Sequence, residues 1–162
     1  AGKTATARLV LRLLEAAPGA AAPRGAEGPL LAADRVLESL GHAATPRNAN
    51  SSRFGKYLRL RPGGGGVLAQ VDTFLLEAGR VAGRAPGERS FHVFHELLAA
   101  RDEPGLGHLG LRPEAEHALL GAGVGAAPPG GPGGAGGLGE LRGALGELGL
   151  AAEAAALPAA LA

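Results

Sequence analysis

The sequence predicts an α/β fold, and three observations support this prediction. Apolar residues recur at helical spacing in residues 30–40 and again in residues 91–98, which is the pattern of amphipathic helices. Apolar and polar residues alternate in residues 56–61, as they do in a half-buried strand. Residues 67–76 are nearly continuously apolar and follow a glycine-rich turn, so we expect the two strand segments to form an antiparallel hairpin.

The composition limits the classes of function. The chain has 162 residues, enough for one domain, but its 29 Gly, 12 Pro and 3% aromatic residues leave few large side chains for a core. A net charge of +1 does not indicate a nucleic-acid partner. There is no cysteine, and no apolar run approaches the roughly 20 residues that span a bilayer. We expect a soluble, cytoplasmic protein without membrane insertion. Because residue 1 is Ala and not Met, we expect that it is not the natural translation start.

The first residues match the end of a phosphate-binding loop. Gly2, Lys3 and Thr4 occupy the last three positions of the motif G-x-x-x-x-G-K-[ST], which is a weak signal by itself. The residues that follow predict an amphipathic helix, and backbone N–H groups at a helix start bind phosphate. In such loops the lysine neutralises the terminal phosphates and the threonine hydroxyl ligates Mg²⁺.

A second helix is expected after a loop in residues 16–29. Pro29 suits its first turn, and its apolar face would hold Leu30, Ala33, Leu37 and Leu40. Asp34 and Glu38 would lie on the opposite, solvent-facing side. We expect Gly41 to end the helix in the left-handed conformation.

Polar residues 48–56 follow, and their composition alone favours a turn before a strand. Leu58 and Leu60 would face one side of the first strand, and residues 67–76 would form a second strand buried on both faces.

Farther along, Phe91, Phe94 and Leu98 share one helical stripe, so we expect this helix to pack on the sheet. His92 and His95 lie three residues apart without a third ligand nearby, which makes them only a partial metal site.

The C-terminal part gives weaker signals. Residues 121–137 are mostly Gly and Pro and are expected to be disordered. A helical stripe returns after them, at Leu138, Leu141, Leu145 and Leu148. Glycines interrupt this stripe, each costing about 1 kcal/mol relative to Ala, so the helix needs a partner.

Several segments resemble the myosin motor family. Residues 48–56, Asn-Ala-Asn-Ser-Ser-Arg-Phe-Gly-Lys, match the switch I pattern N-x-N-S-S-R-F-G-K, and residues 30–47 resemble the helix and turn that lead into it. Residues 72–77 and 85–98 resemble the family's segments I-E-T-Y-L-L-E and A-P-G-E-R-N-Y-H-I-F-Y-Q-L-L, which place an ordinary packing histidine at position 92 and an aromatic residue at 95. The resemblance covers residues 1–100 well and the remainder weakly, and it leans towards class fifteen unconventional myosins.

This resemblance implies an α/β fold that is a fragment of the phosphate-loop myosin motor core, with a mixed sheet and flanking helices. Residues 1–100 would form a partial motor core, and residues 101–162 a degenerate continuation that includes the disordered stretch 121–137. ATP and Mg²⁺ are the implied cofactors. The implied nucleotide-binding residues are Gly2, Lys3, Thr4, Asn48, Ser51 and Ser52, the implied metal ligands are Thr4 and Ser52, and the implied catalytic residues are Asn48, Ser51 and Arg53.

The same resemblance implies an actin-based motor that binds and hydrolyses ATP, with the actin filament as partner and the actin cytoskeleton as location. In the family the arginine at position 53 pairs with a glutamate of switch II, a motif not found in this chain, so we expect Arg53 to have no partner here and the isolated chain to be inactive. Both hairpin strands are expected to have unpaired edges. The alternative is a non-motor paralogue that acts as a binding or scaffolding module without ATP turnover.

Overall fold

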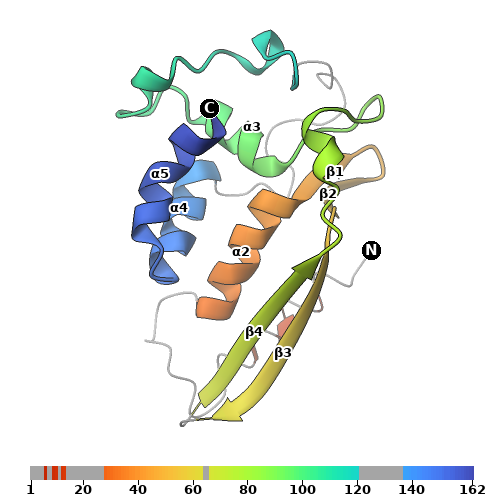
Figure 1. Ribbon diagram of the computed structural model, residues 1–162, viewed down its shortest axis with the longest axis vertical. Coiled ribbons are helices and arrows are strands. Elements are labelled where there is room, and N and C mark those ends of the chain that lie inside the picture. The colour runs from red at the N-terminus through yellow and green to blue at the C-terminus, as the bar shows by residue number, and fades with distance from the viewer. Residues whose placement is uncertain (1–5, 7–8, 11, 14–27, 64–65, 121–136) are drawn as a thin grey trace.

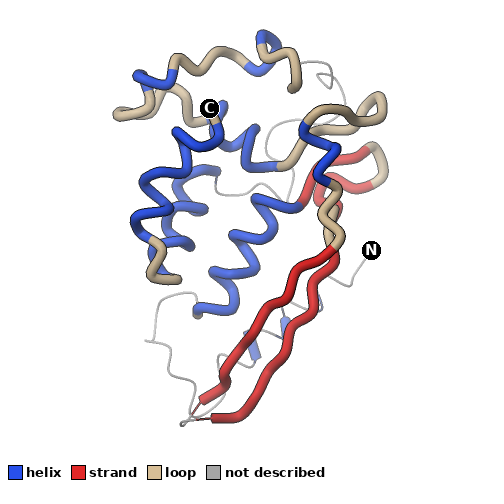
Figure 2. Tube along the Cα trace, in the orientation of Figure 1, coloured by secondary structure: helices blue, strands red, loops and turns tan. Residues whose placement is uncertain are grey.

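The computed structural model describes residues 6, 9–10, 12–13, 28–63, 66–120 and 137–162. Helices gather on one side, and a long hairpin extends away from them (Figures 1 and 2). The predicted phosphate-loop residues and most of residues 121–137 lie outside the described residues. Within the described part of the chain, no helix is long and apolar enough to cross a membrane.

Helix α2 (Pro29–Gly41) begins at a proline, as expected, but its buried face is not the predicted one. Asp34, Glu38 and Ser39 are buried, whereas Leu40 is 39% exposed. The prediction was wrong because these polar groups have partners inside the molecule: Asp34 pairs with Lys56, and Ser39 hydrogen-bonds to a glutamate of α3. Buried polar groups are tolerated when they are paired in this way.

Gly41 does not adopt the predicted left-handed conformation. The helix continues through it, and the chain becomes extended at His42, with φ −107° and ψ 157°. A Cβ atom at position 41 would lie 2.5 Å from Cδ1 and Cε1 of Phe54. Glycine is therefore required here by the close approach of an aromatic ring, because any larger side chain would overlap it.

The described strands form two separate antiparallel pairs. The first joins β1 (His42–Thr45) and β2 (Asn48–Ser52), with a register shift between Ala43 and Thr45. The second joins β3 (Gly55–Gly63) and β4 (Gly66–Phe74), in a register that sets Gly55 opposite Phe74. The α/β class and the predicted hairpin are confirmed, and in the described sheets each of the two hairpin strands, β3 and β4, pairs along one edge only.

The prediction that the second hairpin strand is buried on both faces was wrong. Gln70 and Thr73 are exposed, and Phe74 is 51% exposed. The hairpin projects away from the helical side of the molecule, with α2 beside it (Figure 1), so the helices do not cover both of its faces.

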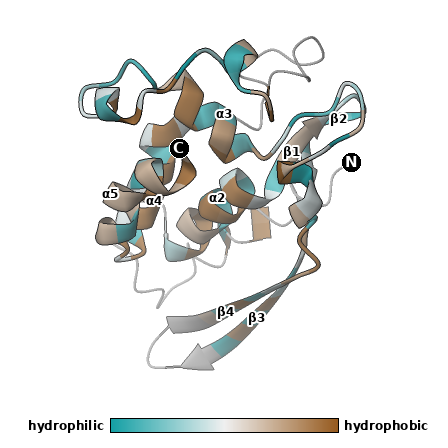
Figure 3. Cartoon of the chain, turned by 45° about the horizontal axis from the view of Figure 1, so that its top comes forward, coloured by the Kyte–Doolittle hydropathy of each residue, from teal (hydrophilic) through white to brown (hydrophobic). Residues whose placement is uncertain are grey.

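The core lies between the helices α2, α3 (His92–Ala99), α4 (Gly137–Glu147) and α5 (Ala151–Leu161). Figure 3 shows that much of the hydrophobic sequence falls on these helices. The predicted stripe on α4 is at its centre: Leu138 is 1% and Leu141 0% exposed, and burial of such a side chain contributes about 1.5–3 kcal/mol. Helix α4 packs against three neighbouring helices, and this packing stabilises a helix that its glycines would otherwise leave marginal.

Helix α3 packs against α4 and α2 and touches β1, so it does not cover the long hairpin as the prediction required. Of its predicted stripe, Phe91 joins the core, Phe94 packs against the core partly buried, and Leu98 is buried. The stripe missed Val93 and Leu97, which are also core residues. Three short 3₁₀ helices complete the described structure: η1 (Ala78–Val81), η2 (Gly107–Leu109) and η3 (Glu114–Glu116).

Candidate functional site

The polar segment that carries the switch-like pattern forms strand β2 and the turn after it. Strand β1 lies between β2 and the segment that precedes α3: Ala43 bridges Phe91, and the backbone N–H of Arg89 donates to the carbonyl of Ala44 at 2.8 Å. On β2, Asn48 and Ser52 are exposed. The strand is thus attached to the helical core through β1, and its polar side chains reach solvent.

Three local hydrogen bonds orient these side chains. The backbone N–H of Asn50 donates to Oδ1 of Asn48 at 3.0 Å, so Asn48 uses its amide oxygen locally and its NH₂ group is the donor that it can offer to a ligand. Nη1 of Arg53 donates to Oγ of Ser51 at 3.1 Å, which leaves the Ser51 hydroxyl hydrogen available. Ser52 uses its hydroxyl hydrogen on the carbonyl of Phe54 at 2.9 Å, which leaves its oxygen lone pairs available.

Arg53 has a carboxylate partner in this chain, contrary to our expectation. Its Nε lies 2.6 Å from Oε2 of Glu77, and the backbone N–H of Glu77 donates to the carbonyl of Arg53 at 3.0 Å. The hairpin register explains the contact, because continuing the Gly55 and Phe74 pairing by two residues brings Arg53 beside residues 76 and 77. The sequence signal was therefore present in the predicted hairpin, but the pairing was not extended to the residues that follow it.

Glu77 also binds Arg80, whose side chain is only 2% exposed. Nε of Arg80 lies 3.0 Å from the same Oε2, and Nη2 of Arg80 lies 2.7 Å from Oε2 of Glu88. Burial opposes ionisation of Glu77, but the hydrogen bonds and charges of Arg53 and Arg80 outweigh this effect and lower its pKa. The four side chains form a continuous ionic cluster from the β2 turn into the interior.

Asn50 is held by two imidazoles. Its Oδ1 accepts hydrogen bonds from Nδ1 of His42 at 2.8 Å and from Nε2 of His92 at 3.1 Å. Burial lowers the pKa of His92 to about 4 although the charge of Glu96 opposes the shift, and burial also lowers the pKa of His42. Both rings are neutral at pH 7, so each has a single N–H to donate.

His95 contacts different residues from those that His92 contacts. Nη2 of Arg89 donates to Nδ1 of His95 at 2.8 Å and also to Oε2 of Glu114 at 2.6 Å. Burial and the charge of Arg89 lower the pKa of His95. Among the residues that the structure describes, no three His, Cys, Asp or Glu side chains are grouped to hold a metal ion.

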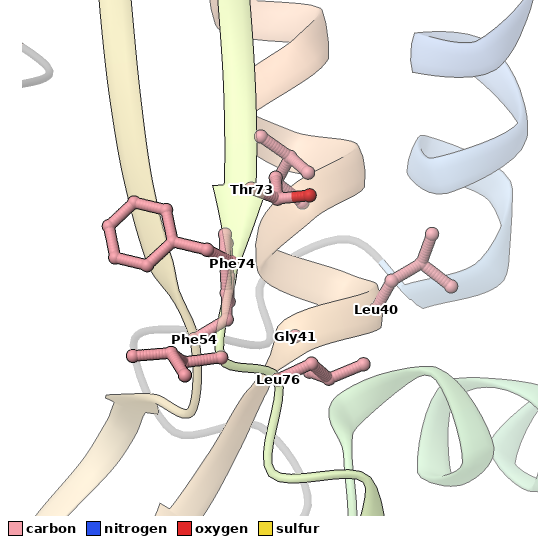
Figure 4. Close-up of a pocket in the computed structure, with 8 residues that line it drawn as sticks. Leu40, Gly41, Phe54, Thr73, Phe74 and Leu76 are labelled. Carbon is pink, nitrogen blue, oxygen red and sulfur yellow. The ribbon is translucent and has the colours of Figure 1, made fainter.

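A mostly apolar pocket of about 320 Å³ lies next to the β2 turn, where α2 ends and β4 ends (Figure 4). Its lining consists of Leu37, Leu40, Gly41, Phe54 and residues 73–76. Leu75 adopts a positive φ of 56° and is 86% exposed, which is unusual for a large apolar residue.

Of the predicted site residues, the structure brings together Asn48, Ser51, Ser52 and Arg53 in one strand and turn. Gly2, Lys3 and Thr4 lie outside the described residues. Sequence reasoning missed Glu77, and it also missed Asn50 together with the histidines that bind it.

Comparison with known families places this chain in a motor-domain family. The profile of the family described as Myosin head (motor domain) matches residues 1–154. The chain belongs to the myosin head family.

Individual relatives support this assignment. The chain is 39% identical over 119 residues to "Myosin IE heavy chain" of Dictyostelium discoideum, a match that covers 71% of this chain and 12% of the relative. It is 41% identical over 123 residues to "Myosin-1" of Arabidopsis thaliana, covering 75% of this chain and 10% of the relative. The match to "Unconventional myosin-VIIb" of Mus musculus is 38% identical over 126 residues and covers 75% and 6% of the two chains. The chain thus spans about a tenth or less of the length of these relatives.

Proposed function

We propose that this chain contributes the switch I side of the ATP site of an actin-based motor. In this proposal Lys3 binds the β and γ phosphates, Thr4 and Ser52 ligate Mg²⁺, and Asn48 and Ser51 contact phosphate oxygens or the attacking water. Gly2 allows the backbone to approach the phosphates. Turnover belongs to the complete motor domain, and the matched region covers only about a tenth of the length of the relatives.

The observation that carries the proposal is the polarity of β2. Asn48 presents an NH₂ group and Ser51 a hydroxyl hydrogen, both of which are donors for phosphate oxygens. Ser52 presents oxygen lone pairs, as a Mg²⁺ ligand must. Local hydrogen bonds set all three orientations, so the residues are arranged before any ligand binds, which reduces the cost of binding.

Mg²⁺, when bound with ATP, would neutralise charge that develops on the phosphates. Ser52 fits the ion because its side chain is short and exposed and its hydroxyl hydrogen is already donated to Phe54. Mg²⁺ prefers hard oxygen ligands such as this hydroxyl.

Arg53 fits a role in closing the site. Its Nε binds Glu77 and its Nη1 binds Ser51, so two of its five N–H donors are committed. A guanidinium can bind a further carboxylate through the remaining edge, and in the complete motor this would be the switch II glutamate. Arg53 would then connect Ser51 to the closing of the pocket.

A change of ligand tests the metal role. Because the chain contains no cysteine, Ser52→Cys introduces a single thiol. We expect the Mg²⁺-dependent affinity for ATP, measured by titration calorimetry, to fall on the order of 10–100-fold, and to recover when thiophilic Cd²⁺ replaces Mg²⁺. Thr73→Cys, an exposed hydroxyl on β4, is the matched control. Unchanged Mg²⁺ affinity in Ser52→Cys, or equal loss in Thr73→Cys, would refute the metal role.

The partner, location and class are further parts of the proposal. The actin filament is the partner, through parts of the motor beyond the matched region, and the actin cytoskeleton of the cytoplasm is the location. The length of the glycine-rich sequence segment 62–66 and the terminal spacing of Ala and Leu favour a class fifteen-like myosin. Reading the complete transcript tests the motor role on which these parts depend: a switch II carboxylate in frame supports ATP turnover on actin, and its replacement would favour a binding module.

A further inference from the structure

We propose that His92 is a positioning residue for strand β2: from α3 it donates a hydrogen bond to Asn50 and so fixes the strand that carries the phosphate-facing groups of Asn48, Ser51 and Ser52. This inference rests on the proposed role of β2 in binding nucleotide. His92 itself does not touch the ligand in this account.

Asn50 has no partner residue in the β1–β2 pairing, at the position where His42 and His92 contact its side chain. Ser51 pairs with Ala43 and Asn48 pairs with Thr45, so Ala49 and Asn50 together lie opposite the single residue Ala44. This two-against-one arrangement is a β-bulge, in which the extra residue loses its ladder partner and the strand bends. Backbone pairing therefore does not set the orientation of Asn50, and side-chain contacts must do so.

Two imidazoles from different elements supply those contacts. His42 comes from the start of β1, and His92 comes from the first residue of α3. The amide oxygen of Asn50 has two lone pairs and receives two N–H donors, at 2.8 and 3.1 Å. The bulge is thus tied both to the neighbouring strand and to the helical core.

The protonation state of both rings suits this geometry. An amide oxygen only accepts, so His42 must carry its proton on Nδ1 and His92 must carry its proton on Nε2. The groups that act on His92 are Glu96 and His95 of α3, His42 of β1 and Arg35 of α2, and burial outweighs the single carboxylate among them. A neutral imidazole with a defined tautomer is a fixed donor, which is what a positioning role needs.

The consequence concerns the residues on either side of the bulge. Asn48 lies two residues before Asn50, and its Oδ1 accepts the Asn50 backbone N–H, so a rotation at Asn50 also turns the Asn48 amide. Ser51 follows directly. Loss of the His92–Asn50 hydrogen bond would make the orientations of the Asn48 amide and the Ser51 hydroxyl less well defined, but it would remove neither donor.

The experiment combines nuclear magnetic resonance with ATP binding, using the full chain. In the unaltered protein, imidazole ¹⁵N shifts must show His92 as the Nε2–H tautomer, and the Nδ1–H tautomer would overturn the proposal without any variant. In His92→Phe we expect amide exchange of Ser51 and Ser52 to speed up on the order of 2–10-fold, the effect of losing one hydrogen bond, while amides of α4 keep their rates. Mg²⁺·ATP affinity should fall by a similar factor.

His92→Gln keeps an N–H donor of similar reach and should restore both readouts, whereas a residue that only fills space would not be rescued in this way. His108→Phe, an exposed histidine on η2, is the control and should change neither readout. If His92→Phe alters exchange but the unaltered chain binds no ATP, the positioning stands and the proposed nucleotide role fails. If the unaltered chain binds ATP and His92→Phe changes neither readout, the positioning role fails alone.

Discussion

Gly41 offers the sharpest test of the structure, because a single added methyl group should meet the ring of Phe54. In Gly41→Ala the new Cβ would lie 2.5 Å from two ring carbons, about 1 Å inside ordinary van der Waals contact, which begins near 3.4 Å. Overpacking of this kind costs about 1–3 kcal/mol. Alanine also has the higher helix propensity, by about 1 kcal/mol, so the expected net loss of stability is up to about 2 kcal/mol.

The assay is urea denaturation followed by far-ultraviolet circular dichroism, since the chain has no tryptophan to report by fluorescence. Gly143→Ala is the matched control: it lies inside helix α4, and a Cβ there meets nothing within 4 Å. The control should gain about 0.5–1 kcal/mol. The same substitution is thus expected to have opposite signs at two helical positions.

A double-mutant cycle with Phe54→Ala identifies the cause. With the ring removed, Gly41→Ala should become neutral or stabilising, because only the propensity difference remains. If Gly41→Ala costs the same with and without the ring, its cause is backbone strain from a left-handed conformation. That result would refute the reasoning from the close contact and restore the prediction made from sequence.

Three further predictions follow from the charges and glycines. Glu77→Gln removes the carboxylate shared by Arg53 and Arg80. Because the Arg53–Glu77 ion pair is partly exposed, we expect the free energy of unfolding, measured by urea denaturation, to fall by about 1 kcal/mol. No change in this free energy would contradict the ionic cluster. The pKa of His92 falls from 6.5 to about 4 on folding, so its contribution to stability is complete above pH 6.5 and is lost as the pH falls towards 4. In thermal denaturation, the melting temperature of His92→Gln should therefore depend less on pH across that window than the melting temperature of the unaltered protein. Gly146→Ala, with open space at its Cβ, should raise the melting temperature by a few degrees, and a decrease would mean that α4 is packed differently.

The sequence predicts the local elements of this chain better than it predicts their surroundings. The hairpin, α2 and the Leu138 stripe follow from periodicity, which depends on neighbours in the chain. The burial of Asp34 was missed because Lys56, its partner, lies 22 residues away and only folding brings the two together. Periodicity assigns a charged face to solvent, and it has no means of recognising a charge that is paired inside.

The candidate site shows the same division. The polar run at Asn48, Ser51 and Ser52 is readable from sequence because it matches a continuous pattern. The bulge at Asn50 and its contact with His92, 42 residues away, depend on strand register and on where α3 packs. Contacts of that kind require the fold, since a shift of one residue in register moves every side chain to the other face.

The ionic cluster distinguishes two kinds of arginine. Arg80 is buried and pairs with both Glu77 and Glu88, so its charge stays neutralised in the interior whether or not Arg53 is bound. Arg53 is partly exposed and shares only Glu77, so water can replace that contact. Arg53 is therefore the exchangeable cation of the cluster and Arg80 the permanent one. When Arg53 breaks its contact, the carboxylates of Glu77 and Glu88 remain around the single guanidinium of Arg80. The resulting net negative charge attracts Arg53 and favours its return, which holds the β2 turn against the cluster.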